Sequence, residues 1–101
     1  MPLSIHQEKS LRRQAHHLKP IVWIGQKGIS ENLLKEVDNA LEHHELIKIK
    51  IQASEKNMRN TIISAIAQEM QAHIVQKIGN IAVFYRENRQ KSNNLLSQLA
   101  K

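Results

Sequence analysis

The hydrophobic pattern of this chain switches repeatedly between the period of a helix and the period of a strand, and no other feature constrains its fold as strongly. Residues 45–51 alternate strictly, with three isoleucines on one side and Lys48 and Lys50 on the other. Such alternation predicts a strand with one buried face and one wet, basic face. Residues 4–18 instead repeat apolar side chains at helical spacing, which predicts an amphipathic helix.

Three segments carry helix signals. Ser4 and Gln7 have the spacing of a capping box at the start of the first helix, and Pro20 must end that helix no later than Lys19. Ser30 is a natural N-cap for the second helix, and a third is expected after Ser54. The expected inner faces are Leu11, Ala15 and Leu18; then Leu33, Leu34, Val37, Ala40 and Leu41; and then Met58, Ile62, Ala65, Ile66 and Met70, with Glu69 at the rim.

Three further segments predict strands. Residues 21–24 form a continuous apolar run that is typical of a strand buried on both faces, which would place Trp23 in the core. Residues 73–78 and 81–85 are joined by Gly79-Asn80, a two-residue hairpin signal. The order α-β-α-β-α-β-β predicts an α/β fold, a two-layer sandwich in which helices pack on a four-stranded mixed sheet.

The length suits one domain. The chain has 101 residues, too few for two independent cores. Periodic segments continue to Arg86, so we expect a domain over residues 1–86. Residues 87–101 are polar and basic with a weak apolar patch, and they predict a basic, mobile C-terminal tail. The apolar side chains of that patch are Leu95, Leu96 and Leu99.

Charge points to a polyanionic partner. Lys and Arg number 15 against 9 Asp and Glu, a net charge of +6. A small domain this basic attracts nucleic acid or an anionic membrane surface. Residues 1–10 lack the apolar core of a signal peptide, and no apolar run approaches the roughly 20 residues of a spanning helix. We therefore expect a cytoplasmic protein that does not bind membranes.

Several chemistries are excluded or disfavoured. The absence of cysteine excludes disulfides, thiolate zinc sites and a cysteine nucleophile. The pairs His16-His17 and His43-His44 point about 100° apart on a helix, so neither clamps one metal ion well. A metal-dependent hydrolase built on these histidines stays open as a minor alternative. With no visible catalytic set, we expect no enzyme and no cofactor.

The sharpest local feature is the loop Gly25-Gln26-Lys27-Gly28, between an expected strand and a capped helix. Two glycines allow unusual backbone angles and close approach, and the helix start offers free N–H groups. The KH domain uses a G-x-x-G loop in this way on an RNA backbone. A plain tight turn is the alternative. A nucleotide-hydrolysing loop is excluded, because only two residues separate the glycines.

Basic residues come from several segments: Arg12, Arg13, His16, Lys19, Lys27, Lys48, Lys50, Arg86 and Arg89. Because the first helix ends just before the first strand, its basic side could lie near the Gly25–Gly28 loop. Trp23, Phe84 and Tyr85 are too few for an aromatic stacking sheet, although Trp23 would add one stacking contact if it were exposed rather than buried. The pattern therefore favours recognition of RNA backbone and shape.

Several motifs together resemble a known family. They are Ala15-His16-His17-Leu18-Lys19-Pro20, Ile24-Gly25-Gln26-Lys27-Gly28, His43-His44-Glu45-Leu46-Ile47-Lys48, Ile78-Gly79 and Val83-Phe84-Tyr85-Arg86. With this combination, residues 4–86 resemble the CRM domain (chloroplast RNA splicing and ribosome maturation), and more narrowly its stand-alone bacterial YhbY-type members. The resemblance implies a fold similar to the C-terminal domain of bacterial translation initiation factor three.

The resemblance also implies a function. It implies an RNA-binding protein that associates with rRNA of the large-subunit precursor (pre-50S) and assists ribosome assembly, with ribosomal proteins as further partners. We expect a monomer. The candidate RNA-binding residues are Gly25, Gln26, Lys27, Gly28, Arg12, Arg13, His16, Lys19, Lys48, Lys50 and Arg86. The alternative is a protein-interaction module that docks a ribosomal or other protein through the tail or an exposed sheet face.

Overall fold

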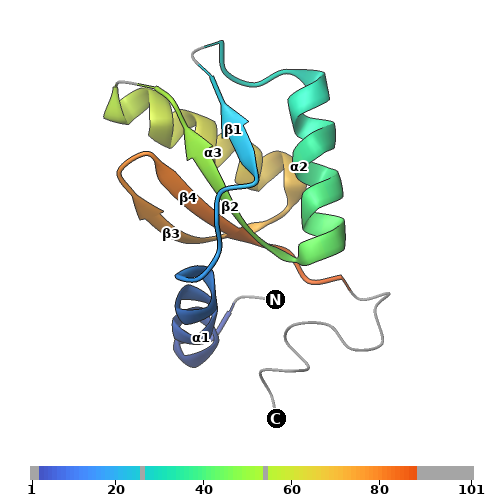
Figure 1. The fold of residues 1–101 in the computed structure, drawn as a ribbon, viewed down its shortest axis with the longest axis vertical. Helices are drawn as coiled ribbons and strands as arrows, with labels where there is room; N and C mark the ends of the chain where they lie inside the picture. Colours follow the sequence, from blue (N-terminus) through green and yellow to red (C-terminus); the bar gives the residue numbers. More distant parts are fainter. Residues whose placement is uncertain (1–2, 26, 54, 89–101) are drawn as a thin grey trace.

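Helices and strands follow one another in the order that the sequence predicts. The computed structural model describes residues 3–25, 27–53 and 55–88. Its elements are α1 (Ile5–Ala15), β1 (Val22–Ile24), α2 (Glu31–His44), β2 (Leu46–Ile51), α3 (Lys56–Met70), β3 (His73–Ile78) and β4 (Ile81–Tyr85). The predicted α-β-α-β-α-β-β order is therefore confirmed (Figure 1).

The four strands form one mixed sheet in the order β1-β2-β4-β3. β1 runs parallel to β2, as expected for strands joined by the crossover helix α2. The hairpin β3–β4 is antiparallel and turns at Gly79, whose φ of 54° suits glycine. The second strand of the hairpin pairs with β2, which puts β2 in the interior of the sheet. The predicted mixed sheet is confirmed.

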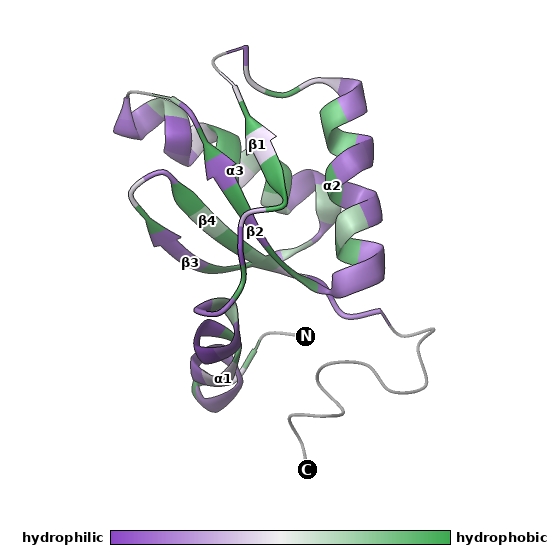
Figure 2. Ribbon diagram, in the orientation of Figure 1, coloured by the Kyte–Doolittle hydropathy of each residue, from purple (hydrophilic) through white to green (hydrophobic). Residues whose placement is uncertain are grey.

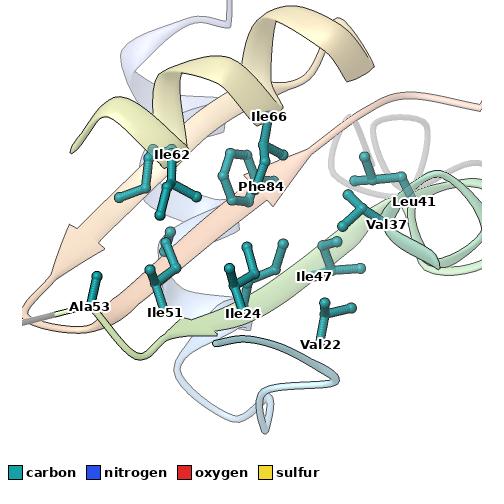
Figure 3. Packing of buried hydrophobic residues seen from close by; sticks show 13 residues of the cluster. Val22, Ile24, Val37, Leu41, Ile47, Ile51, Ala53, Ile62, Ile66 and Phe84 are labelled. Carbon is teal, nitrogen blue, oxygen red and sulfur yellow. The ribbon is translucent and has the colours of Figure 1, made fainter. Parts of the chain in front are cut away.

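The main core lies between the sheet and the helices α2 and α3 (Figure 3). Every second residue of β2 points into it, so Ile47, Ile49 and Ile51 are almost fully buried. Each contributes roughly 2 kcal/mol by leaving water. The helices supply Val37, Leu41, Ile62, Ile63 and Ile66, and the other strands supply Val22, Ile24, Ala82 and Phe84.

α1 packs on the opposite face of the sheet. Leu11 and Ala15 are fully buried there against Leu46, Val75, Val83 and Tyr85. The Arg12 Nε donates a hydrogen bond of 3.1 Å to the carbonyl oxygen of Val75, which ties α1 to β3. α1 lies at one end of the sheet, and α3 passes behind the sheet (Figure 1). Most of the face seen in Figure 1 is therefore left uncovered by the described helices.

Both predicted helix starts are present. Ser4 and Gln7 form the capping box, with reciprocal backbone-to-side-chain hydrogen bonds of 2.9 and 3.0 Å. The Ser30 hydroxyl accepts from the backbone N–H of Leu33 at 3.1 Å. Local hydrogen-bonding chemistry fixes these starts, which is why the sequence signals them well.

The first strand departs from its predicted burial. Val22 and Ile24 are buried in the main core, but Trp23 between them is 57 % exposed. The prediction of a strand buried on both faces, with Trp23 in the core, was therefore wrong. The physical reason is that α1 packs mainly against β2 and β3, away from the edge strand β1. The outer face of β1 is consequently left without a covering helix in the described part of the chain.

The predicted helix faces need smaller corrections. Leu18 lies beyond the end of α1 and is 38 % exposed, and Met58 is 49 % exposed at the start of α3. Ile63 is buried although it was not expected to be. α3 therefore presents a broader apolar face to the sheet than its predicted stripe.

The C-terminal segment is described only as far as Asn88. Its backbone N–H donates to the Glu45 carboxylate at 2.9 Å, and its side-chain amide donates to the carbonyl oxygen of Glu42 at 3.0 Å. The first residues after β4 are thus bonded to the end of α2. Residues 89–101 of the predicted tail, including Arg89 and its three leucines, lie outside the described residues.

Candidate nucleic-acid interface

The Gly25–Gly28 loop leads from β1 into α2. The backbone N–H of Gly28 donates to the carbonyl oxygen of Gly25 at 3.1 Å, and Gly28 has a φ of 78°. That φ favours glycine, so the turn itself requires Gly28. Gly25 is exposed, and a Cβ added at either glycine would meet nothing within 4 Å. Backbone and open space at the loop can therefore receive a close-fitting ligand group.

Lys27 is exposed beside this open backbone. α2 begins at Glu31, shortly after the loop. The free backbone N–H groups of its first turn place a partial positive charge at the end of α2 that faces the loop. These features suit a phosphate, and phosphate binding by the loop stays a prediction. Gln26, the remaining predicted loop residue, lies outside the described residues.

A row of side chains crosses the uncovered sheet face from one edge to the other. Trp23 pairs with Lys50, Lys50 pairs with Ile81, and Ile81 pairs with Ile78. Residues paired directly across a sheet share a face. Lys48 lies two residues before Lys50 and projects to the same side. We call this surface the open face: Trp23, Lys48, Lys50, Ile78 and Ile81.

The open face and α1 together enclose a shallow hollow of about 200 Å³. Its basic lining comes from Arg12 and His16 at the end of α1 and from Lys48 on β2. The remaining lining residues are Gln76, Ile78, Ile81 and Val83. Three predicted RNA-binding residues from segments far apart in the sequence are thus brought to one site.

Arg12 is held in place at this hollow. Its Nε bonds to the carbonyl oxygen of Val75, and a terminal nitrogen lies 3.8 Å from the carboxylate of Glu8. About half of the side chain stays exposed. The fixed guanidinium can therefore offer its remaining N–H groups to a phosphate without first losing conformational freedom.

A second hollow, of about 180 Å³, adjoins the first through Lys48. Lys19 and His44 line it with apolar side chains, which are Leu18, Ile21, Leu46 and Ile47. The shared lysine joins both hollows into one surface. We define the basic band as four residues that line these hollows, Arg12, His16, Lys19 and Lys48, together with Lys50, which lies two residues beyond Lys48 on the same face of β2. Figure 2 shows α1 as largely hydrophilic and β2 with alternating hydrophilic and hydrophobic segments.

The basic side of α1 does not lie beside the glycine loop. Figure 1 shows α1 at one end of the molecule and the β1–α2 loop at the other. β1 runs away from α1, and residues 16–21 add further separation. The predicted proximity of α1 to the loop was wrong, and the open face fills the space between them. Arg13 is exposed on α1 but lines neither of the two hollows.

Arg86 lies in a different environment. Its guanidinium forms an ion pair of 2.8 Å with Asp38 and one of 3.4 Å with Glu42, and it donates to the carbonyl oxygen of Met70 at 3.2 Å. Its side chain is 20 % exposed. These contacts tie the end of β4 to α2 and α3. The predicted RNA contact of Arg86 stays a prediction, and we leave this residue out of the interface.

In the described ranges no three histidine, aspartate or glutamate side chains are grouped so that they could hold a metal ion. None of the helices in those ranges is both long and apolar enough to span a bilayer. Tyr85 is fully buried and stacks on His73 with ring centres 6.2 Å apart.

Sequence reasoning favoured the core for Trp23 and therefore left it out of the predicted RNA-binding residues. The burial of β1 alternates, with Val22 and Ile24 buried and Trp23 exposed, but all three side chains are apolar and the sequence shows no such alternation. A run of four apolar residues is too short for that period to be seen against continuous burial.

Known proteins similar to this chain share one description. The chain matches the family model of the CRS1 / YhbY (CRM) domain over residues 3–86. It is 44 % identical over 88 residues to an RNA-binding protein of Haemophilus influenzae, covering 87 % of this chain and 89 % of that protein. It is 35 % identical over 95 residues to a probable RNA-binding protein of Pseudomonas aeruginosa, covering 94 % and 91 % of the two chains.

A solved structure is similar as well. The solution structure of a hypothetical protein from Staphylococcus aureus, described as a candidate RNA-binding protein, superposes with a TM-score of 0.78 at 32 % identity. The match covers 92 % of this chain and 97 % of that one. The fold, the glycine loop and these matches together show that the chain belongs to the CRS1 / YhbY (CRM) domain family.

Proposed function

We propose that this protein binds structured RNA of the large-subunit precursor through the basic band and the Gly25–Gly28 loop, and assists ribosome assembly in the cytoplasm. One observation carries the RNA part: Arg12 and His16 at the end of α1 line one hollow together with Lys48 of β2, on an uncovered sheet face. Relatives named as RNA-binding proteins support it. The ribosomal part rests on the family resemblance.

The proposed mechanism has two stages. The net charge of +6 draws the protein to RNA at long range. Phosphates then dock along the basic band, while a further phosphate sits on the backbone and Lys27 of the loop. Phosphate contacts position a protein on RNA without reading bases, so recognition depends on the fold of the RNA.

The salt dependence of binding tests the interface. We expect the affinity for a folded fragment of large-subunit rRNA, measured by fluorescence anisotropy, to fall steeply with salt. Each of Lys48→Ala and Lys27→Ala should weaken binding and reduce the slope of log K against log salt by about 0.7 to 0.9, one phosphate contact.

Lys77→Ala is the matched control. Lys77 is an exposed lysine on β3, but it pairs with Ala82 and therefore points to the α2–α3 side of the sheet. Its removal should leave the slope unchanged. Salt-insensitive binding, or equal effects of Lys48→Ala and Lys77→Ala, would remove the basic band from the mechanism.

The ribosomal part has its own test. RNA crosslinked to the protein in cells and then sequenced should be dominated by precursor rRNA of the large subunit. Reads dominated by messenger or transfer RNA would overturn the ribosomal assignment and leave RNA binding intact.

A second candidate function is the docking of a ribosomal protein on the open face. The observation that favours it is the exposure of two large apolar side chains there, Trp23 at 57 % and Ile78 at 62 %. An exposed apolar surface of this kind suits a protein partner.

A further inference from the structure

Trp23 is a large aromatic side chain that lies exposed on the sheet surface. It is the one tryptophan of the chain, and 57 % of it is exposed, whereas Phe84 and Tyr85 are fully buried. It lies on β1, an edge strand, and β1 contacts only β2 in the sheet. Its ring is therefore accessible on the open face without any movement of the described elements.

The neighbours of Trp23 on that face are cationic. Lys50 is its direct partner across the parallel pair, at the roughly 4.8 Å spacing of adjacent strands. Lys48 lies one step further along the same face of β2, where the backbone N–H of Ile21 donates to its carbonyl oxygen at 3.0 Å. The aromatic ring thus has the lysines of β2 beside it, and the partly exposed Ile21 lies two residues before it on the same side.

An exposed aromatic ring beside lysines suits one class of partner, nucleic acid, better than another, protein. The centres of protein–protein interfaces are depleted of lysine, because burying an ammonium is costly. Proteins that bind single-stranded nucleic acid pair positive charge, which follows the backbone, with an aromatic ring on which a base stacks. The charge beside Trp23 therefore favours a nucleotide over a protein.

The position of Trp23 in the chain links it to the glycine loop. Trp23 precedes Gly25 by two residues, about 7 Å along a strand. A base that stacks on the ring has its phosphates within reach of both the loop and Lys50. A base inside a duplex is already stacked on both sides, so the ring can receive only an unpaired base.

We propose that Trp23 is a stacking platform for an unpaired RNA base next to a structured region, so that this protein prefers loops or bulges to fully paired duplex. The inference rests on the proposed RNA binding and names the kind of RNA that is bound. Stacking tolerates any base, so the preference is for an unpaired nucleotide and not for a sequence.

The single tryptophan makes the site directly observable. The full chain is titrated with an RNA hairpin that carries an unpaired uridine loop, and with a blunt, fully paired RNA duplex of the same number of phosphates. We expect the hairpin to quench Trp23 fluorescence and protect it from acrylamide, whereas the duplex should bind with little change in emission.

Variants separate stacking from charge. Trp23→Leu should weaken hairpin binding about five-fold or more and leave duplex binding unchanged. Trp23→Phe should retain part of the difference, because it keeps an aromatic face. Met58→Ala, which removes an exposed apolar side chain from α3, is the control and should bind both RNAs like wild type. Because Trp23 is largely exposed, its variants should keep the wild-type melting temperature.

The outcomes separate this inference from the proposed function. If Trp23→Leu binds the hairpin like wild type while Lys48→Ala weakens binding, the platform is wrong and RNA binding stands. If wild type binds neither RNA, the proposed function fails, and the inference fails with it. If Trp23→Leu retains RNA affinity but loses a co-purifying ribosomal protein, the open face docks protein, and the stacking proposal is overturned.

Discussion

Tyr85 combines complete burial with an ionisable hydroxyl that has no hydrogen-bond partner among the residues the structure describes. Burial raises the pKa of that hydroxyl well above its usual range, and the negative charges of Glu45 and Glu87 raise it further. The hydroxyl therefore stays protonated in the folded protein. It has no route to a ligand, and its role is packing beneath α1.

The raised pKa predicts a loss of stability at high pH. The unfolded chain loses the Tyr85 proton above about pH 10, while the folded chain keeps it. The contribution of Tyr85 to the free energy of unfolding is fully present below pH 10. Above pH 10 it falls by about 1.4 kcal/mol per pH unit.

The single tyrosine allows a direct measurement by tyrosinate absorbance. The tyrosinate signal should appear only together with unfolding, and Tyr85→Phe should flatten the high-pH loss of stability that is due to this group. A folded chain that shows tyrosinate near pH 10 would contradict the buried environment. Near neutral pH, Tyr85→Phe should cost little, because no described hydrogen bond is lost.

The environments of Trp23 and Arg86 could not be predicted from their residue types and sequence neighbours. An apolar tryptophan in an apolar run suggests core, and an arginine in a basic chain suggests ligand contact. Trp23 is exposed because no described helix covers the outer face of β1, and Arg86 is engaged because Asp38 and Glu42 of α2 lie beside the end of β4. Both outcomes depend on neighbours that are distant in the sequence.

At the scale of elements, the β1–α2 loop separates a glycine needed for folding from one available for binding. Gly28 has a φ of 78°, which strains any other residue. Gly25 has no positive φ and is surrounded by open space. Gly25 is therefore free of the backbone constraint that explains Gly28.

This difference predicts opposite effects of two alanine substitutions. Gly28→Ala should lower the free energy of unfolding by about 1 kcal/mol, measured by chemical denaturation. Gly25→Ala should leave stability unchanged but weaken RNA binding, because its methyl group occupies the space where a phosphate approaches. Wild-type RNA affinity of Gly25→Ala would show that the loop is only a turn.

Helix starts were the elements best predicted from the sequence. Ser4, Gln7 and Ser30 make the capping bonds that their spacing indicates. The end of α1 was less clear, because Leu18 continues the apolar spacing although the helix stops at Ala15. Capping depends on residues three apart, whereas the end of α1 depends on the path of the chain toward β1.

At the scale of the whole molecule, the position of α1 creates the candidate interface. It packs over one end of the sheet and leaves the rest of that face open, which brings Arg12 and His16 beside Lys48. The net charge of +6 indicated a polyanion without giving a surface. The packing of α1 concentrates part of that charge in the basic band.

Truncation tests whether the interface is contained in the domain. A chain ending at Asn88 keeps the basic band, the loop and the bonds from Asn88 to α2. We expect it to remain associated with ribosomal particles in gradient sedimentation, with a somewhat shallower salt dependence because three cations are removed, Arg89, Lys91 and Lys101. Complete loss of association, with stability unchanged, would favour the protein-interaction module that docks through the tail.

The sequence by itself determined the order of elements, the helix starts, the buried side of β2, the hairpin and the glycine loop. Each follows from interactions between residues close in the chain, or from a period that one strand or helix displays alone. Only the tertiary structure decided which face of the sheet α1 covers, that Trp23 is exposed and that Arg86 is paired. Those outcomes depend on the packing of distant segments, and local periodicity carries no information about what lies across the sheet.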